Sequence, residues 1–247
     1  MFVVIFLASF GAFVIQTMNA GVLNDPPETG DGHDYDAIAY NVWKGRGFGY
    51  DWSDPEWREP YQGIRRFRLV LRRRSEYYPT TYRRPAMPYL LSATYSVSDR
   101  SFAAWRIVNC GITAAAVTTG AIVAAHFGGA GAAVVAAVIG LQSPHLTYYS
   151  QRFLTEPLAT LLLSLVALAW IRTARDGWTQ AGAVTSGALL GALIAARSIF
   201  VLSLPVVLLL PGRAGPGLKS VWRAKAICVA TAVVLMSPWW GGYGTSV

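Results

Sequence analysis

The residues of this sequence with the clearest chemical potential are charged side chains at the ends of apolar segments. Glu156 opens one such segment and Arg197 closes another. A carboxylate in an apolar environment carries a high free-energy cost unless it has a partner or a function. An arginine can bind phosphate oxygens through the paired donors of its guanidinium. Two structural interpretations stay open. Glu156 can pair with Arg152, four residues earlier at helical spacing, and Arg197 can extend its charged end to a membrane interface.

A cluster of acids early in the chain supplies further carboxylates. Asp31 and Asp34 stand just before a run of apolar residues at helical spacing, and Gly45 follows that run. The run consists of Tyr35, Ile38, Ala39 and Val42. The pattern predicts a short helix along a membrane surface, ended by the glycine. Both acids then lie near its N-terminus, where the helix dipole stabilises negative charge. The alternative is that these acids are only caps and solvated loop charges.

Cysteine and histidine offer little metal chemistry here. Cys110 and Cys228 both lie inside apolar stretches, where a cysteine is usually a small core residue and a disulfide is not expected. The sequence has no Cys/His cluster with zinc-ligand spacing. A lone histidine such as His33 or His145 is more often structural than a metal ligand.

The distribution of charge along the chain indicates which segments position these charged residues. Of the 247 residues, 53% are apolar and only 14% are charged. Residues 21–100 contain 12 Lys and Arg against 11 Asp and Glu, whereas the rest of the chain has 9 against 2. This distribution excludes a soluble globular domain, a disordered chain and a nucleic-acid binder with one basic patch. It predicts a polytopic membrane protein with one large polar loop.

We expect about seven transmembrane helices, since a span needs about 20 mostly apolar residues. The first is residues 1–20, and the alternative of a cleaved signal peptide is disfavoured because the segment lacks a basic start. Residues 21–100 are the polar loop with short interfacial helices, and residues 101–247 hold about six further spans. Those six lie near 102–125, 127–142, 154–171, 181–196, 198–211 and 226–240. The predicted fold is an all-α polytopic membrane protein.

Basic residues in short loops predict the orientation of the chain in the membrane. One such loop carries Arg172 and Arg175. The other carries Arg213, Lys219, Arg223 and Lys225. Both loops should face the cytoplasm, which places residues 21–100 outside. The arginine-rich stretch 58–74 is then expected to contact lipid headgroups or balance nearby acids rather than bind nucleic acid.

Four motifs occur in the order found in a known family. They are Asp31-Gly-His-Asp34-Tyr35 with Gly45-x-Gly47-Phe48; Pro79-Thr-Thr-Tyr82-Arg83-x-Pro85-x-x-Pro88; Pro144-x-x-x-Tyr148 with Leu154-Thr155-Glu156-Pro157-Leu158; and Gly187-x-x-x-Gly191-Ala192 with Ala196-Arg197, followed by Ser237-Pro238-Trp239. The chain resembles lipid-linked-sugar glycosyltransferases of the GT-C fold, in the group that includes bacterial protein O-mannosyltransferases and the lipid A aminoarabinose transferase. The resemblance extends over nearly the whole chain.

This resemblance implies transfer of a sugar from a polyprenyl-phosphate carrier, with inversion, on the external (periplasmic) face of the plasma or inner membrane. The acceptor (protein, lipid A or polysaccharide) is open. Asp31 matches the family's catalytic acid and is expected to be the base, with Asp34 as a second acid for orientation or metal binding. Arg197 is expected to hold the carrier phosphate. Further candidates for substrate binding are Glu156, Arg83, Arg84, Arg106 and His145. Members of this fold differ in their need for a divalent metal, so one is kept as a candidate cofactor.

The sequence departs from the family pattern in the arginine-rich stretch 53–76 and at Ser198, where the family has proline. It also stops near the end of the family's shared seven-span module, so the family's C-terminal spans are expected to be missing. Two other functions stay open: a lipid or solute transporter, and a non-catalytic or truncated GT-C-like protein. A transporter should show charges in mid-span or a repeated half, and neither is evident.

Overall fold

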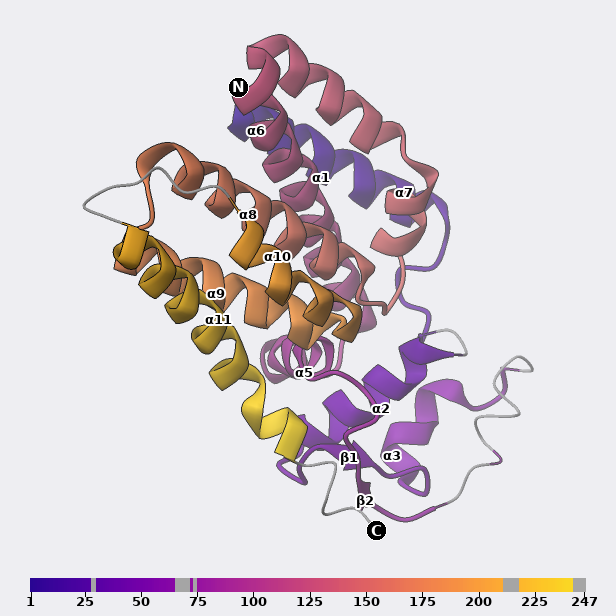
Figure 1. Cartoon of the computed structure of the whole chain (residues 1–247). Helices are drawn as coiled ribbons and strands as arrows, with labels where there is room; N and C mark the ends of the chain where they lie inside the picture. Colours follow the sequence, from indigo (N-terminus) through magenta and orange to yellow (C-terminus); the bar gives the residue numbers. More distant parts are fainter. Residues whose placement is uncertain (28–29, 65–71, 73–74, 211–217, 242–247) are drawn as a thin grey trace.

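The computed structural model describes residues 1–27, 30–64, 72, 75–210 and 218–241, and it consists mainly of α-helices. A bundle of long helices makes up most of it, and a smaller module of short elements lies at one end of that bundle (Figure 1). Most of the arginine-rich stretch 58–74 lies outside the described residues, as does Arg213 of the predicted cytoplasmic loop.

Four of the described helices are long and apolar enough to cross a membrane. They are α1 (Phe2–Asn19), α6 (Phe102–Gln142), α8 (Glu156–Asp176) and α11 (Leu218–Gly241). The shorter apolar helices of the bundle are α9 (Gln180–Ala196), the 3-10 helix η3 (Ser198–Ser203) and α10 (Leu204–Leu209). Large apolar side chains such as Val4, Ile139 and Leu209 stay exposed on these helices. Extended exposed apolar surface of this kind is typical of a protein that meets lipid.

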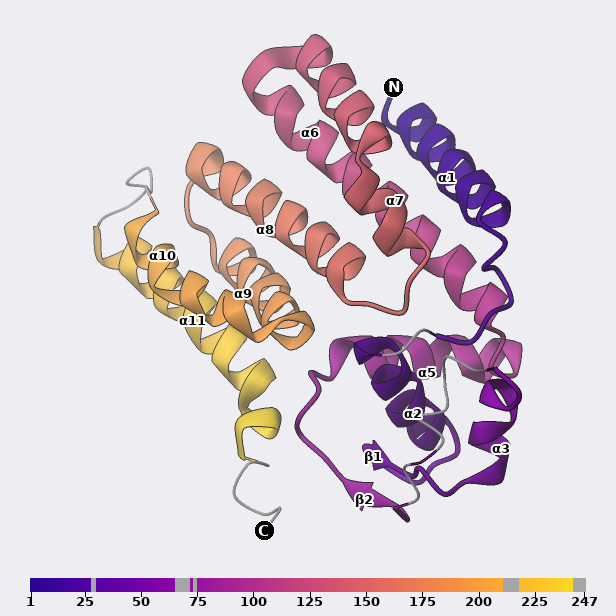
Figure 2. The same ribbon diagram turned by 90° about the vertical axis from the view of Figure 1, so that its right-hand side faces the viewer.

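The longest helix, α6, is broken at a pair of glycines. Gly128 and Gly129 have non-helical backbone angles, and Gly129 has φ +66°, a left-handed value that glycine adopts at little cost. The second arm of α6 folds back along the first (Figure 2), so that Gly140 lies against Val117. The break predicted between the segments 102–125 and 127–142 is confirmed.

The predicted number of seven spans goes beyond what helix length and hydropathy support. Four helices meet both conditions. In contrast, α9 has 17 residues, and η3 and α10 have 6 each, fewer than the roughly 20 of a typical span. The structure therefore agrees with an all-α membrane protein that has at least four candidate spans, and seven crossings stay a prediction.

Small residues let α9 and α11 approach each other closely. A Cβ atom on Gly187 would lie 2.4 Å from the carbonyl oxygen of Cys228, and one on Gly191 would lie 3.2 Å from the Cβ atom of Leu235. Close backbone approach at small residues is typical of helices packed in membranes. This packing fixes the direction of α9. It therefore also fixes the position of Arg197, which is the C-cap of α9.

The small module is built from residues of the predicted polar loop. It contains α2 (Asp31–Trp43), β1 (Gly49–Tyr50), α3 (Pro55–Arg58), the 3-10 helix η1 (Glu59–Tyr61), β2 (Tyr78–Pro79) and α5 (Ala86–Ser98). The two strands pair antiparallel, with Gly49 opposite Pro79. The predicted helix in the acidic region is confirmed, and Gly45 beyond its end has φ +72°. A short helix, α7 (Pro144–Ser150), connects α6 to the segment that leads into α8.

Helix α2 is the core of this module, which corrects the prediction of a helix laid on a membrane surface. Residues 32–41 are all buried. Ile38 and Tyr40 pack against an aromatic cluster, whereas Tyr35 and Ala39 pack against α5. The aromatic cluster is Tyr50, Trp52, Trp57 and Tyr61. They come from several short segments, and the spacing within each segment does not indicate that they pack over α2.

A buried carboxylate on α2 ties the module together. Asp36 is fully buried and accepts hydrogen bonds from Trp57 Nε1 (2.8 Å), from the Tyr61 hydroxyl (2.7 Å) and from the Tyr95 hydroxyl of α5. It also pairs with Arg100, whose Nη2 lies 2.6 Å from Asp36 Oδ2. Burial by itself would lower the pKa of Arg100, but the charge of Asp36 outweighs it and raises that pKa. One carboxylate thus connects α2, α3, η1 and α5 with the turn before α6.

We expect Asp36→Asn to destabilise the protein strongly. The variant leaves Arg100 buried beside a neutral amide, and breaking a buried ion pair by removing one partner typically costs about 3–5 kcal/mol. The melting temperature of the purified protein in detergent, followed by circular dichroism, measures the effect. Glu59→Gln is the control, because it neutralises an exposed carboxylate of the same module. Equal melting temperatures for the two variants would contradict the role of Asp36.

Close packing of α9 on α11 makes a second prediction. Gly187→Ala places a methyl group against the backbone of Cys228, so the helices must separate and the melting temperature should fall. Gly120→Ala in α6 is the matched control, because a Cβ atom there meets nothing within 4 Å. Alanine is a better helix former than glycine by about 1 kcal/mol, so the control should be neutral or slightly stabilised. A stable Gly187→Ala variant would contradict the close approach.

Candidate functional site

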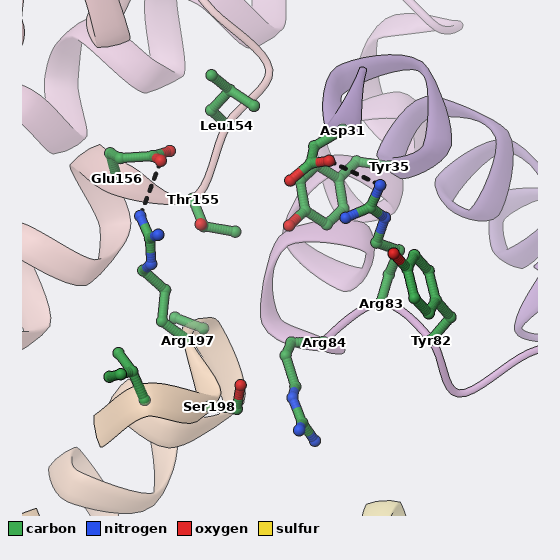
Figure 3. A pocket seen from close by; sticks show the side chains of 12 residues that line it. Asp31, Tyr35, Tyr82, Arg83, Arg84, Leu154, Thr155, Glu156, Arg197 and Ser198 are labelled. Carbon is green, nitrogen blue, oxygen red and sulfur yellow. Dashed lines mark hydrogen bonds and ion pairs between the residues drawn. The ribbon is translucent and has the colours of Figure 1, made fainter. Parts of the chain in front are cut away.

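A cavity of about 270 Å³ lies between the small module and the bundle. Its walls come from four places: the start of α2, the segment before α5, the start of α8 and the junction of α9 with η3 (Figure 3). The lining residues are Asp31, Tyr35, Tyr82, Arg83, Arg84, Leu154, Thr155, Glu156, Ala196, Arg197, Ser198 and Ile199. Three of these side chains are cationic and two are anionic, so the lining carries one excess positive charge.

One wall holds the two acids of α2 around a single arginine. Nη2 of Arg83 lies 2.7 Å from Asp31 Oδ1 and 2.6 Å from Asp34 Oδ2, and Arg83 Nε donates a further hydrogen bond to Asp34 (3.1 Å). Asp34 is nearly buried, whereas the side chain of Asp31 is 51% exposed. The chain enters α2 through Gly30, whose φ of +103° suits glycine. Asp31 therefore presents a carboxylate to the cavity from the first turn of a well-fixed helix.

Tyr35 lies one turn after Asp31 and also lines the cavity. Burial raises the pKa of Tyr35, and the charge of Asp31 adds to the rise. Burial would lower the pKa of Arg83, but its ion pairs with Asp34 and Asp31 outweigh burial and raise it. The phenol is thus a neutral hydrogen-bond donor and the guanidinium a permanent cation at neutral pH.

The opposite wall holds a second ion pair. Arg197 Nη1 lies 2.7 Å from Glu156 Oε1, and the pair joins the end of α9 to the start of α8 (Figure 3). Spacing allowed Glu156 to pair with Arg152; the structure shows Glu156 paired with Arg197, and the Arg152 guanidinium lies over the ring of Tyr148. Arg197 is 42% exposed, so it can also meet a ligand.

Arg84 is the third cation of the lining. Its side chain lies apart from both ion pairs (Figure 3). Nη1 of Arg84 is buried and makes no hydrogen bond within the described residues. A buried guanidinium nitrogen without a partner is costly. Arginine binds phosphate and carboxylate oxygens in a fork, and because Arg84 lines the cavity, its guanidinium is a candidate donor to an anionic group there.

Two of the residues predicted to bind substrate lie away from the cavity. Arg106 is buried and donates hydrogen bonds to backbone carbonyls of Leu23 (2.9 Å), Asp25 (2.7 Å) and Gln151 (3.1 Å). It thereby holds the chain after α1 against the chain after α7. His145 is exposed on α7 and does not line the cavity. The other six predicted site residues lie on the cavity walls or, as Asp34 does, pair with a residue of the wall.

Sequence reasoning missed the aromatic part of the site. Tyr35 was named only as an apolar position and as a member of the first motif, although its spacing of four from Asp31 places both side chains on one helix face. Tyr82 is 72% exposed and its ring lies 4.8 Å from the Arg83 guanidinium. The signals for Tyr82 in the sequence were its place in the second motif and its position next to a candidate arginine.

Two apolar hollows flank the polar cavity. One, of about 460 Å³, shares Glu156, Arg197 and Ile199 with it and continues between α8 and η3 along Leu163 and Phe200. The other, of about 390 Å³, lies among α5, α9 and α11 and includes Tyr89 and Trp239. The first is therefore continuous with the charged lining.

The described residues contain no group of three His, Cys, Asp or Glu side chains placed to hold a metal ion. Asp31 and Asp34 face the guanidinium of Arg83 instead. In this arrangement the two carboxylates are paired with a side-chain cation.

Comparisons of this chain with protein-family models, with curated proteins and with solved structures find no match. The function must therefore be argued from the cavity itself.

We expect inorganic phosphate to bind in the cavity and to raise the melting temperature of the detergent-solubilised protein. Arg197→Gln removes a charged donor and should weaken the apparent affinity about tenfold, the effect of losing about 1.5 kcal/mol from a charge-assisted hydrogen bond. Arg172→Gln is the matched control, because Arg172 is exposed near the other end of α8. Equal phosphate dependence in wild type and Arg197→Gln would contradict the anion site.

Proposed function

We propose that this chain is the membrane module of a glycosyltransferase. It transfers a sugar from a polyprenyl-phosphate donor to an acceptor hydroxyl on the external face of a membrane, with inversion at the anomeric carbon. The proposal includes a GT-C fold, in which the two arms of α6, α9 and the η3–α10 segment each cross the membrane with α1, α8 and α11. This arrangement gives seven crossings and leaves the small module outside.

The observation that carries this proposal is the convergence of the four family-like motifs on one cavity. Asp31 comes from the first motif and Arg83 from the second, whereas Glu156 comes from the third and Arg197 from the fourth. These residues span most of the sequence, yet each motif contributes one charged side chain to the same lining. A resemblance spread over separate short motifs is thereby supported by a single site.

The cavity has the parts that such a transfer needs. The acceptor hydroxyl must lose its proton as it attacks the anomeric carbon, and the exposed carboxylate of Asp31 can accept that proton. The bond between the anomeric carbon and the phosphate oxygen breaks, and the phosphate leaves with the electron pair. Its charge then lies near Arg84 and Arg197, which can stabilise it. No general acid is needed, because the phosphate is stable as an anion.

The position of the cavity suits a donor with a lipid chain. The charged lining lies at the junction of the bundle with the small module, as expected for a headgroup at a membrane surface. The apolar hollow between α8 and η3 begins at Glu156 and Arg197. When Arg197 binds the phosphate, the polyprenyl chain can therefore lie in this hollow, against Leu163 and Phe200.

We expect Asp31→Asn to abolish sugar transfer and to leave the amount of membrane-inserted protein unchanged. The amide keeps the size of the side chain but cannot act as a base, and loss of a general base typically costs about 10²–10⁴ in rate. Mass spectrometry of the glycans and glycolipids of expressing cells measures the effect. Asp176→Asn is the control, because Asp176 is exposed at the far end of α8.

Two outcomes of this experiment would count against the proposal. Unchanged transfer by Asp31→Asn would remove Asp31 as the base. If the wild-type chain adds no new glycan or glycolipid to cells that lack it, the non-catalytic alternative is favoured instead.

A further inference from the structure

Arg83 engages two carboxylates of different character with one nitrogen. Its Nη2 atom contacts both Asp31 (2.7 Å) and Asp34 (2.6 Å), while its Nε atom binds only Asp34 (3.1 Å). The guanidinium therefore contacts Asp34 through two of its nitrogens and Asp31 through one. Because Asp34 is nearly buried and Asp31 is half exposed, the contact with Asp31 is the weaker and more solvent-screened of the two.

The surroundings of Arg83 favour movement of its terminal nitrogens (its outer end) over movement of the whole side chain out of the site. The guanidinium carbon lies 4.8 Å from the ring centre of Tyr82 and 5.6 Å from that of Tyr35. Both distances fall within the range of cation–π attraction. A rotation that keeps the Nε contact with Asp34 can thus remove Nη2 from Asp31, and with it the Nη2 contact with Asp34, while the aromatic rings still support the cation.

The cavity supplies a competitor for that outer end. Arg83 lines the same space as Arg84 and Arg197, so a tetrahedral oxyanion bound there is within the reach of a third arginine. Arginine forks bind such oxyanions in a bidentate manner. The Oδ1 atom of Asp31, however, is paired with the Arg83 guanidinium.

We propose that Arg83 is a positioning residue that masks the Asp31 carboxylate until the phosphate group of a lipid-linked donor enters the cavity and draws the guanidinium away. The inference rests on the proposed function, since it assigns Asp31 as the base. It links availability of the base to donor binding, so that Asp31 is freed only when there is a sugar to transfer.

Carboxylate labelling tests the mask without any sugar transfer. The purified protein in detergent micelles is treated with a water-soluble carbodiimide and glycine ethyl ester, and peptide mass spectrometry follows the rate at Asp31. The probe is inorganic sulfate, compared with chloride at equal ionic strength, because phosphate consumes the carbodiimide. We expect slow labelling of Asp31 in chloride and labelling several-fold faster in sulfate. In Arg83→Gln, labelling should be fast in both salts.

Internal references keep the comparison sound. Glu59 is exposed outside the cavity and should label at one rate throughout, whereas the buried Asp36 should stay unlabelled while the module is folded. Arg83→Lys keeps the charge but loses the fork, so it should give an intermediate rate with a reduced response to sulfate. If Asp36 becomes labelled in Arg83→Gln, the module of that variant is unfolded. The test of the mask then rests on the wild-type and Arg83→Lys rates.

A second arm identifies the source of the anion. The methyl ester of a polyprenyl phosphate, a phosphodiester that the carbodiimide does not consume, should unmask Asp31 at a lower concentration than sulfate does when it is added to the micelles. Equal labelling of Asp31 in wild type and Arg83→Gln overturns the mask, and a wild-type rate that ignores both anions overturns the release. A response to sulfate but not to the polyprenyl phosphate ester overturns the link to a lipid donor. These rates do not depend on turnover, so absence of transfer in cells would reject the proposed function and leave the mask intact.

Discussion

The buried carboxylate of Asp36 is the contact on which the rest of the small module depends. Ten consecutive residues of α2 are buried, and the only charge that α2 places fully inside is compensated by Arg100 and by three hydroxyl or indole donors. An ion pair desolvated to this degree is favourable only when its remaining acceptors are satisfied. The network therefore specifies one position for α2, and with it the direction in which Asp31 and Asp34 leave the first turn.

The bundle imposes a separate constraint on the other wall of the cavity. Close approach of α9 to α11 at Gly187 leaves little freedom in the direction of α9, and its C-terminal end carries Arg197 to the start of α8. The ion pair with Glu156 then joins two helices that the chain connects only at their opposite ends. Two independently fixed structures thus meet at the cavity, and the distance between their charged groups follows from how each is packed.

Much of the local structure could be predicted from the sequence, whereas the contacts between distant segments could not. Periodicity located α2, and the division of the apolar residues into the segments 102–125 and 127–142 located the break in α6, because both signals are local. Glu156 and Arg197 were placed at helix ends, but their pairing joins positions 41 residues apart that no pattern connects. Arg106 resembled a ligand-binding cation for the same reason: its carbonyl partners are backbone groups, which leave no trace in residue types.

Charge in the cavity is largely balanced within each wall. Arg83 is neutralised by Asp31 and Asp34, and Arg197 by Glu156, so both walls are stable without a ligand. Arg84 adds a buried donor without a hydrogen bond. In the proposed mechanism, an incoming anion competes for these guanidinium groups. Each displaced arginine then frees a carboxylate, which couples binding of the donor to exposure of the base.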